Sequence, residues 1–150
     1  MKTVFDKSIA DSLVERIAQL NENSSRQWGK MSPSQMVRHC ILSEEMYQGT
    51  TAYKRLFIGR LFGKMALKST LKDENPLKKN EPTHPTFKIK GEGDLTAEKE
   101  AWAGLIKQYN SLNGTTFDNF VHPFFGAMNK DQIGHMVYKH TDHHLRQFGV

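Results

Sequence analysis

The C-terminal stretch KHTDHHLRQFGV concentrates imidazole side chains, with His140, His143 and His144 inside five consecutive residues. An expression tag would be an unbroken run of histidines, whereas other residues are interleaved here, so the cluster belongs to the protein. Two histidines four residues apart on a helix can present their nitrogens to one metal ion. His140 and His144 have that spacing. Thr141 and Asp142 stand between them, so the glutamate base of the helical metalloprotease motif is absent.

A helical wheel indicates which way these rings face. With Ile133 at zero and about 100° per residue, His140 and His144 fall within about 20° of it, in the middle of the apolar face. His143 falls at the edge of that face, and His135 on the opposite side, which predicts His135 in solvent. A buried imidazole needs a hydrogen bond or a metal. The pair alone fits both satisfied core histidines and a metal site.

A third ligand would have to come from another helix, and His39 is the candidate. It flanks the apolar face of the segment that follows Ser32, so its ring can turn into a bundle. His39, His140 and His144 together would leave a coordination position open to water or substrate, as in catalytic zinc sites. His143 is the alternative ligand should His140 turn away.

The remaining candidates are interpreted as structural. Cys40 is expected to be a small core residue rather than a ligand or nucleophile. His84 and His122 are each followed by proline and are expected in loops.

Helical periodicity dominates the chain and supplies the elements that would position these residues. Apolar residues recur at three- and four-residue steps from Val4 to Leu20. The second helix is expected to begin at a capping box of Ser32, Pro33 and Gln35 and to end at Gly49, the next to be capped by Thr96, and the last by Asn129 with Gln132. The buried stripe of the third of these helices is expected to be Ala101, Trp102, Leu105, Ile106, Tyr109 and Leu112.

Two segments lie between the second of these helices and Thr96. YKRLFIGRLFGKMALK is apolar and basic, and a helix interrupted by Gly59 and Gly63 is expected there. DENPLKKNEPTHPTFKIKGEGD, residues 73–94, carries proline and glycine without a period and is expected to be a long, mobile loop. This loop and the RLFGKM segment would shape the mouth of a pocket. Four substantial helices with almost no strand pattern predict an all-α fold, a four-helix bundle.

Composition limits the class of protein. A chain of 150 residues is expected to form one domain, residues 1–150, and the single Cys40 fits a reducing cytoplasm. No signal peptide or membrane-spanning run is present, so a membrane is not an expected partner. A net charge of +5 and a pI near 9.3 raise nucleic acid as a partner. The cations are scattered without a nucleic-acid motif, so we expect a solvated basic surface instead.

The segments WGKMSPSQMVRHC and HPFFGAMNKDQIGHMVYKHTDHHLRQFG resemble the DinB/YfiT-like superfamily, specifically a branch whose C-terminal motifs are HP-x-FG and KH-x-x-HHL-x-QFG. The resemblance implies an up-down-down-up four-helix bundle with a three-histidine site for a divalent metal such as zinc or nickel. One ligand would come from the second helix and two from the last, which are the positions of His39, His140 and His144. Characterised relatives include metal-dependent transferases that use low-molecular-weight thiols and a thiol-dependent isomerase.

Two functions are consistent with these features. The first is a metal-dependent enzyme, a thiol S-transferase or hydrolase, that acts on a small-molecule substrate such as a low-molecular-weight thiol. The alternative is a non-enzymatic bundle of the same fold that is stabilised by metal or that binds a partner through its basic surface. A homodimer is the oligomeric state considered.

Overall fold

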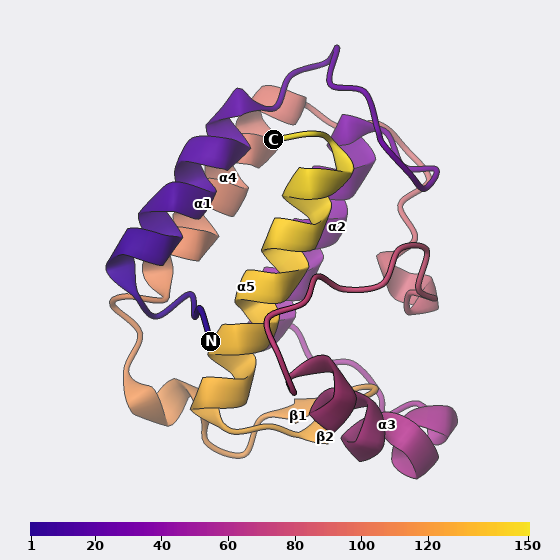
Figure 1. The fold of residues 1–150 in the computed structure, drawn as a ribbon, viewed down its shortest axis with the longest axis vertical. Helices are drawn as coiled ribbons and strands as arrows, with labels where there is room; N and C mark the ends of the chain where they lie inside the picture. The colour runs from indigo at the N-terminus through magenta and orange to yellow at the C-terminus, as the bar shows by residue number, and fades with distance from the viewer.

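The computed structural model describes residues 1–150, and helices account for nearly all of its regular structure (Figure 1). The elements in chain order are α1 (Lys7–Gln19), α2 (Pro33–Tyr47), α3 (Phe57–Thr70), the 3₁₀ turn η1 (Pro85–Phe87), α4 (Leu95–Gln108), the 3₁₀ turn η2 (Gly114–Phe117), β1 (Val121–His122), β2 (Gly126–Ala127) and α5 (Lys130–Gln147). The two short strands form an antiparallel hairpin. The predicted all-α class is therefore confirmed.

Four of the helices form the bundle. Helix α4 packs against α1 and α2, and α5 packs against the same two helices from the other side. Followed along the chain, α1 rises, α2 and α4 both descend, and α5 rises again (Figure 1). Helices α2 and α4 run in the same direction because the long connection between them, residues 48–94, returns the chain to the end of the bundle where α2 began. The expected up-down-down-up order is what the structure has.

Side-chain caps define where the helices begin. Ser32 and Gln35 form a reciprocal capping box at α2, and Asn129 and Gln132 form another at α5, both as predicted. The expected cap of α4 was wrong. Asp94, not Thr96, accepts a hydrogen bond from the Ala97 amide, and the helix begins at Leu95. An aspartate in this position also interacts favourably with the positive end of the helix dipole.

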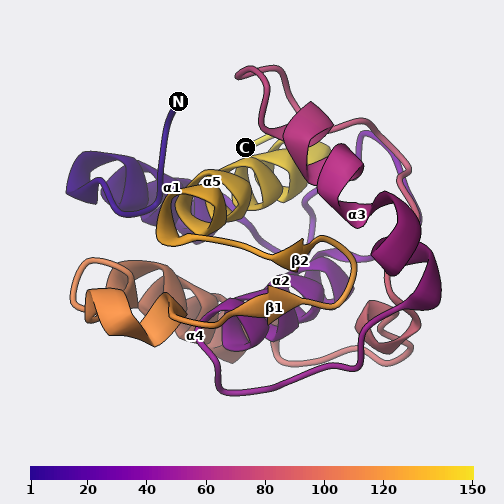
Figure 2. The ribbon, with the colours of Figure 1, turned by 90° about the horizontal axis from the view of Figure 1, so that it is seen from below.

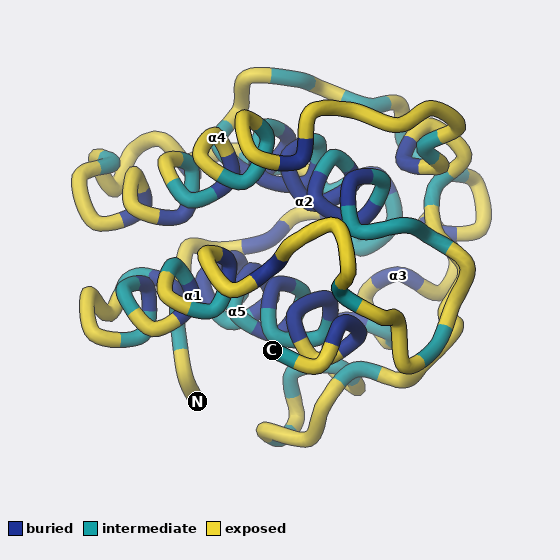
Figure 3. Tube along the Cα trace, turned by 90° about the horizontal axis from the view of Figure 1, so that it is seen from above, coloured by how far each residue is buried: buried dark blue, intermediate teal, exposed yellow.

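The buried residues line the sides of the helices that face one another (Figure 3). The side chains of Trp102 and Ile106 on α4 and of Tyr109, its C-cap residue, are fully enclosed, which confirms the centre of the predicted stripe. Ala101 is exposed and Leu105 and Leu112 are only partly buried, so the stripe is narrower than expected. None of the helices is both long enough and apolar enough to span a bilayer.

Helix α3 lies outside the bundle, against the β1–β2 hairpin (Figure 2). The expected interruption at Gly59 and Gly63 was wrong, because the helix runs through both residues without a break. A Cβ atom at either position would overlap the carbonyl oxygen of Phe124. These glycines therefore serve close packing of the helix on the hairpin, and not a break in the helix. Arg55 secures the same contact by donating to the Pro123 and Phe124 carbonyls.

Residues 71–94, which we call the strap, connect α3 to α4 and contain only the 3₁₀ turn η1, so the predicted long loop is confirmed. Contacts with the rest of the chain hold it in place. Lys139 of α5 donates through Nζ to the carbonyls of Thr70 and Asp73, at 2.7 and 2.8 Å. Lys79 lies over the ring of Trp28. The mobility expected of this segment stays a prediction.

Candidate metal centre

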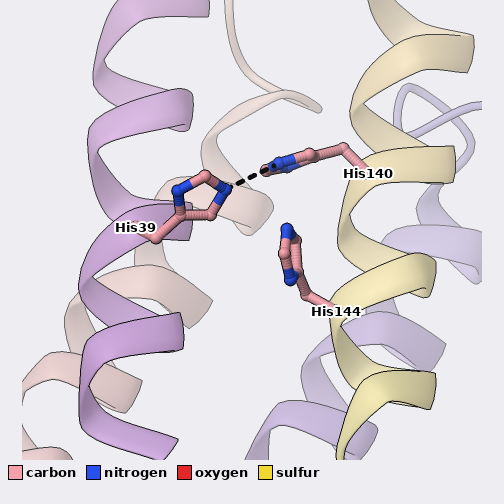
Figure 4. A group of neighbouring side chains, drawn as sticks. All are labelled: His39, His140 and His144. Atoms are coloured by element: carbon pink, nitrogen blue, oxygen red, sulfur yellow. Dashed lines mark hydrogen bonds between the residues drawn. The ribbon is translucent and has the colours of Figure 1, made fainter. Parts of the chain in front are cut away.

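Three imidazoles meet between α2 and α5 in the bundle (Figure 4). His39 comes from α2, and His140 and His144 come from successive turns of α5. The ring centroids lie 5.2 Å apart for His39 and His140, 4.7 Å for His39 and His144, and 4.6 Å for His140 and His144. One nitrogen from each ring lies within 4.8 Å of the others. The structure thus brings together the three residues that the wheels and the resemblance singled out.

A backbone carbonyl on the strap orients His39. The Nδ1 atom of this buried ring lies 3.1 Å from the carbonyl oxygen of Phe87. Because a carbonyl oxygen only accepts, Nδ1 must carry the hydrogen, which leaves the lone pair on Nε2. The Nε2 atom points toward His140.

A side-chain amide orients His144 in the same way. Its Nδ1 lies 2.9 Å from Oε1 of Gln147, while Nε2 of Gln147 donates to the Trp28 carbonyl at 3.0 Å. The second bond fixes which end of the amide faces His144, since the Trp28 carbonyl accepts only from the amide nitrogen of Gln147 and the amide oxygen has no hydrogen to donate. His144 therefore also carries its hydrogen on Nδ1 and its lone pair on Nε2. One ring nitrogen of His144 points toward the other two rings (Figure 4).

His140 has a different environment. Its Nε2 lies 3.2 Å from Nε2 of His39, whereas its Nδ1 is buried and has no hydrogen-bond partner. His140 is also the least buried of the three residues. Because the lone pair of His39 points at His140, the contact requires either a hydrogen on His140 Nε2 or a cation shared by the two nitrogens.

The environment keeps these rings neutral. Burial is the main cause that lowers the pKa of His39, and the Phe87 carbonyl partly opposes it. Burial and the neighbouring imidazoles hold the pKa values of His140 and His144 well below the ordinary range of histidine. A neutral imidazole offers a free lone pair at physiological pH, which is the form that binds a metal.

The spacing of two of the nitrogens fits a divalent metal, and the third lies within 4.8 Å of both. Two nitrogens bound at about 2.0–2.1 Å to a tetrahedral ion lie about 3.3–3.4 Å apart. The Nε2 atoms of His39 and His140 are 3.2 Å apart, close to that value. Three neutral imidazoles occupy three positions of a tetrahedron and leave the fourth open. The donor set, its spacing and the two fixed tautomers all suit such an ion.

The other histidines lie outside the cluster. The ring of His143 packs against Trp28 at an angle of 59°, with 5.3 Å between ring centroids, and does not join the cluster. His122 accepts through Nδ1 from the Phe124 and Phe125 amides and shapes the hairpin turn, and burial lowers its pKa to about 3. His84 accepts from the Thr86 amide at the start of η1. Neither proline-adjacent histidine belongs to the cluster, as predicted. His84 lies in a loop, whereas His122 is the last residue of β1, so the loop prediction holds for His84 alone.

Three further expectations concern His135, the RLFGKM segment and Cys40. His135 is half-buried rather than exposed, because the N-terminal segment crosses that side of α5 and the Lys2 carbonyl accepts from its Nδ1. The RLFGKM segment was expected at a pocket mouth, but Leu61, Phe62 and Met65 face solvent. Cys40 is buried, and burial raises the pKa of its thiol well above the ordinary value, so it is an unreactive core residue as expected.

Sequence reasoning missed three residues that support this region. Gln147 stands three residues after His144 on the same helix, a spacing that could have indicated its role. The Phe87 carbonyl carried no side-chain signal. Buried Lys139 was also missed, because a lysine inside a helix ordinarily indicates a solvated face.

The fold and the site define a class of protein, namely a helical protein with a buried cluster of three histidines that could hold a metal ion. The chain belongs to the DUF1569 family, described as a protein of unknown function, whose family model matches residues 5–149. That range includes all three histidines and the residues that orient them. No curated protein and no solved structure is significantly similar to the chain.

Proposed function

We propose that this chain is a divalent-metal-dependent enzyme of the DinB/YfiT-like superfamily, with His39, His140 and His144 as the ligands of zinc or nickel. One observation carries the proposal: two of the three rings have their hydrogen fixed on Nδ1, which directs the lone pairs of His39 and His144 to the inside of the cluster. Histidines that served only core packing would need a hydrogen-bond partner for each ring nitrogen. They would not need two acceptors, the Phe87 carbonyl and the Gln147 amide oxygen, that turn the free lone pairs into one cluster.

The chain's residues perform two tasks in this proposal. The Phe87 carbonyl and the Gln147 amide hold two ligands in place, so little conformational freedom is lost on binding. His140, the least buried of the three residues, marks the side from which a substrate would reach the open position. A bound divalent ion acts as a Lewis acid and lowers the pKa of a thiol or water.

The cluster contains histidine alone and no carboxylate, so no Asp or Glu in it can act as a general base. This donor set supports chemistry in which the group held at the open position is itself the nucleophile. A low-molecular-weight thiol is the proposed substrate class, with thiol S-transfer as the reaction and hydrolysis by bound water as the second candidate.

Metal titration of single variants tests the ligand set. His39→Ala, His140→Ala and His144→Ala should each weaken zinc or nickel binding by at least about a hundredfold, because each removes one of three ligands. His135→Ala is the matched control, since it lies on the same helix outside the cluster, and it should bind like the parent. Circular dichroism of each variant separates lost affinity from lost fold. Folded variants that all bind like the parent would refute the metal site.

Chelation separates the enzyme from the metal-stabilised alternative. An open catalytic site should lose its metal with the helices intact, whereas a structural site should unfold when the metal is removed. The protein loaded with metal should then be assayed against thiols paired with electrophiles. Turnover that disappears on chelation and in His140→Ala supports the enzyme, and a bound metal without turnover across such a panel favours the non-enzymatic alternative.

A further inference from the structure

Helix α3 exposes a set of large apolar side chains that have no partner in the chain. Their exposed fractions run from half to more than three quarters: Phe57 77%, Ile58 57%, Leu61 63%, Phe62 50% and Met65 67%. Single exposed apolar residues are ordinary on protein surfaces, but five on one helix form a contiguous patch. Five of the seven large apolar side chains that the chain exposes are on this helix.

These side chains share one face. At about 100° per residue they occupy an arc of about 140°, centred opposite the buried face made by Gly59, Gly63 and Leu67. The glycine face packs on the hairpin, and α3 lies at the outside of the bundle (Figures 1 and 2). The apolar arc on the opposite side of the helix therefore faces solvent, as the exposed fractions of its side chains show. The contact with the hairpin thus fixes the orientation in which the apolar arc is presented.

The charges on α3 and on the residues that flank it, from 54 to 72, are all positive. Residues 54–72 contain the six cations Lys54, Arg55, Arg60, Lys64, Lys68 and Lys72 and no Asp or Glu. Arg60, Lys64 and Lys68 recur every fourth residue and form a row along one border of the apolar arc. Arg55 is committed to the hairpin carbonyls, whereas no ion pair within the chain neutralises the three cations of this row.

We propose that α3 is an interfacial helix that docks this chain on an anionic membrane surface. Phe57, Leu61 and Met65 would enter the boundary between headgroups and acyl chains, with Arg60, Lys64 and Lys68 at the lipid phosphates. An amphipathic helix with phenylalanine and leucine on one face and lysine and arginine beside it is the form that lies in this interface. The inference is independent of the metal site, because α3 supplies none of the three histidines.

A lipid surface suits this face better than a second copy of the chain. A symmetric pair would bring together two cationic segments that contain no acid, and like charges in an interface oppose association. An anionic bilayer supplies apolar depth and negative charge together. The absence of a spanning segment had argued against any membrane partner, but a helix that lies in the interface does not need to span.

Vesicle co-sedimentation tests the proposal with the full chain. We expect binding to vesicles of phosphatidylcholine mixed with phosphatidylglycerol, little binding to phosphatidylcholine alone, and weaker binding as salt is raised, since salt screens the headgroup charge. Arg60→Gln, Lys64→Gln and Lys68→Gln combined should lower the partition coefficient by about a hundredfold, at about fivefold per cation. Leu61→Gln with Phe62→Gln should lower it by at least about tenfold.

Matched controls remove the same charge elsewhere. Lys88→Gln, Lys90→Gln and Lys107→Gln combined change three exposed lysines outside α3 and should leave the partition coefficient within about twofold of the parent. Retained helical content, measured by circular dichroism, shows that the variants are folded. Binding equal to the parent's in the α3 variants, or no binding to anionic vesicles, would overturn the proposal. So would a dimer in solution that Leu61→Gln with Phe62→Gln dissociates, since the face would then belong to a second copy.

Discussion

At the scale of single residues, the candidate metal centre depends on which nitrogen of each ring holds a hydrogen. The wheels could predict that His140 and His144 face inward and that His39 can join them, since helix geometry alone decides this. They could not predict the tautomers. Those depend on the Phe87 carbonyl, whose place follows from the path of the strap, and on the Gln147 amide, which the Trp28 carbonyl orients.

Gln147 offers a test of this arrangement at the same scale. Gln147→Ala removes the acceptor for His144 Nδ1 and leaves the ligand nitrogens unchanged, so zinc affinity should fall by about ten- to a hundredfold. Isothermal titration of the parent and the variant measures the difference. Gln108→Ala, at an exposed position of α4, is the matched control and should bind like the parent. An unchanged affinity in Gln147→Ala would mean that the amide does not orient His144.

At the scale of elements, most boundaries could be predicted because caps are local chemistry. The boxes at Ser32 and Asn129 each need only residues within one turn. The predicted break at Gly59 and Gly63 of α3 was wrong because the role of these glycines depends on a distant part of the chain. Their role is set by the Phe124 carbonyl, which is far away in the sequence and reaches the helix only through the hairpin.

Two glycine substitutions of the same kind should have opposite effects on stability. Gly104→Ala in α4 meets no neighbouring atom and should raise the free energy of unfolding by about 0.5–1 kcal/mol, because alanine favours the helix. Gly63→Ala should lower it, by about 1–3 kcal/mol, because its Cβ overlaps the Phe124 carbonyl and α3 must shift away from the hairpin. Urea unfolding of both variants measures the pair. Stabilisation by Gly63→Ala would show that α3 is not held against the hairpin.

At the scale of the whole molecule, the core contains a carboxyl group that the site does not use. Glu44 of α2 is fully enclosed and accepts a hydrogen bond of 2.6 Å from the Tyr109 hydroxyl, while its other oxygen has no partner. Burial raises the pKa of Glu44 from 4.5 to about 8, and Tyr109 opposes the shift, as do Thr141 and Trp102, which lie nearby outside hydrogen-bond geometry. Glu44 is therefore protonated at neutral pH in the folded chain.

This raised pKa predicts a pH dependence of stability. The unfolded chain ionises Glu44 near 4.5 and the folded chain near 8, so its contribution is complete below the first value and is lost as pH rises through the second. The loss is at most about 1.4 kcal/mol per pH unit. Glu44→Gln should remove this slope in urea unfolding of the chelated protein between about pH 5 and 8.

Glu45→Gln, the neighbouring and less buried position, is the control and should keep the slope of the parent. The histidines contribute equally to all three proteins and cancel in the comparison. A parent whose stability rises steadily with pH across this range, with no difference from Glu44→Gln, would mean that the carboxyl ionises in the folded state. The sequence could not have predicted Glu44, since a glutamate between Ser43 and Glu45 gives no sign that α4 will enclose it.

The hydrogen bond from His39 to the Phe87 carbonyl has a thermodynamic consequence. A cation held at Nε2 draws electron density through the ring and makes Nδ1–H a stronger donor, so it tightens the hold of α2 on the strap. Coupling of this kind is reciprocal. If attachment of the strap to His39 raises the affinity for the cation by some factor, the bound cation raises the equilibrium constant for strap attachment by the same factor. Residues 85–87, which supply no side chain to the cluster, would therefore become more ordered when His39 holds a cation.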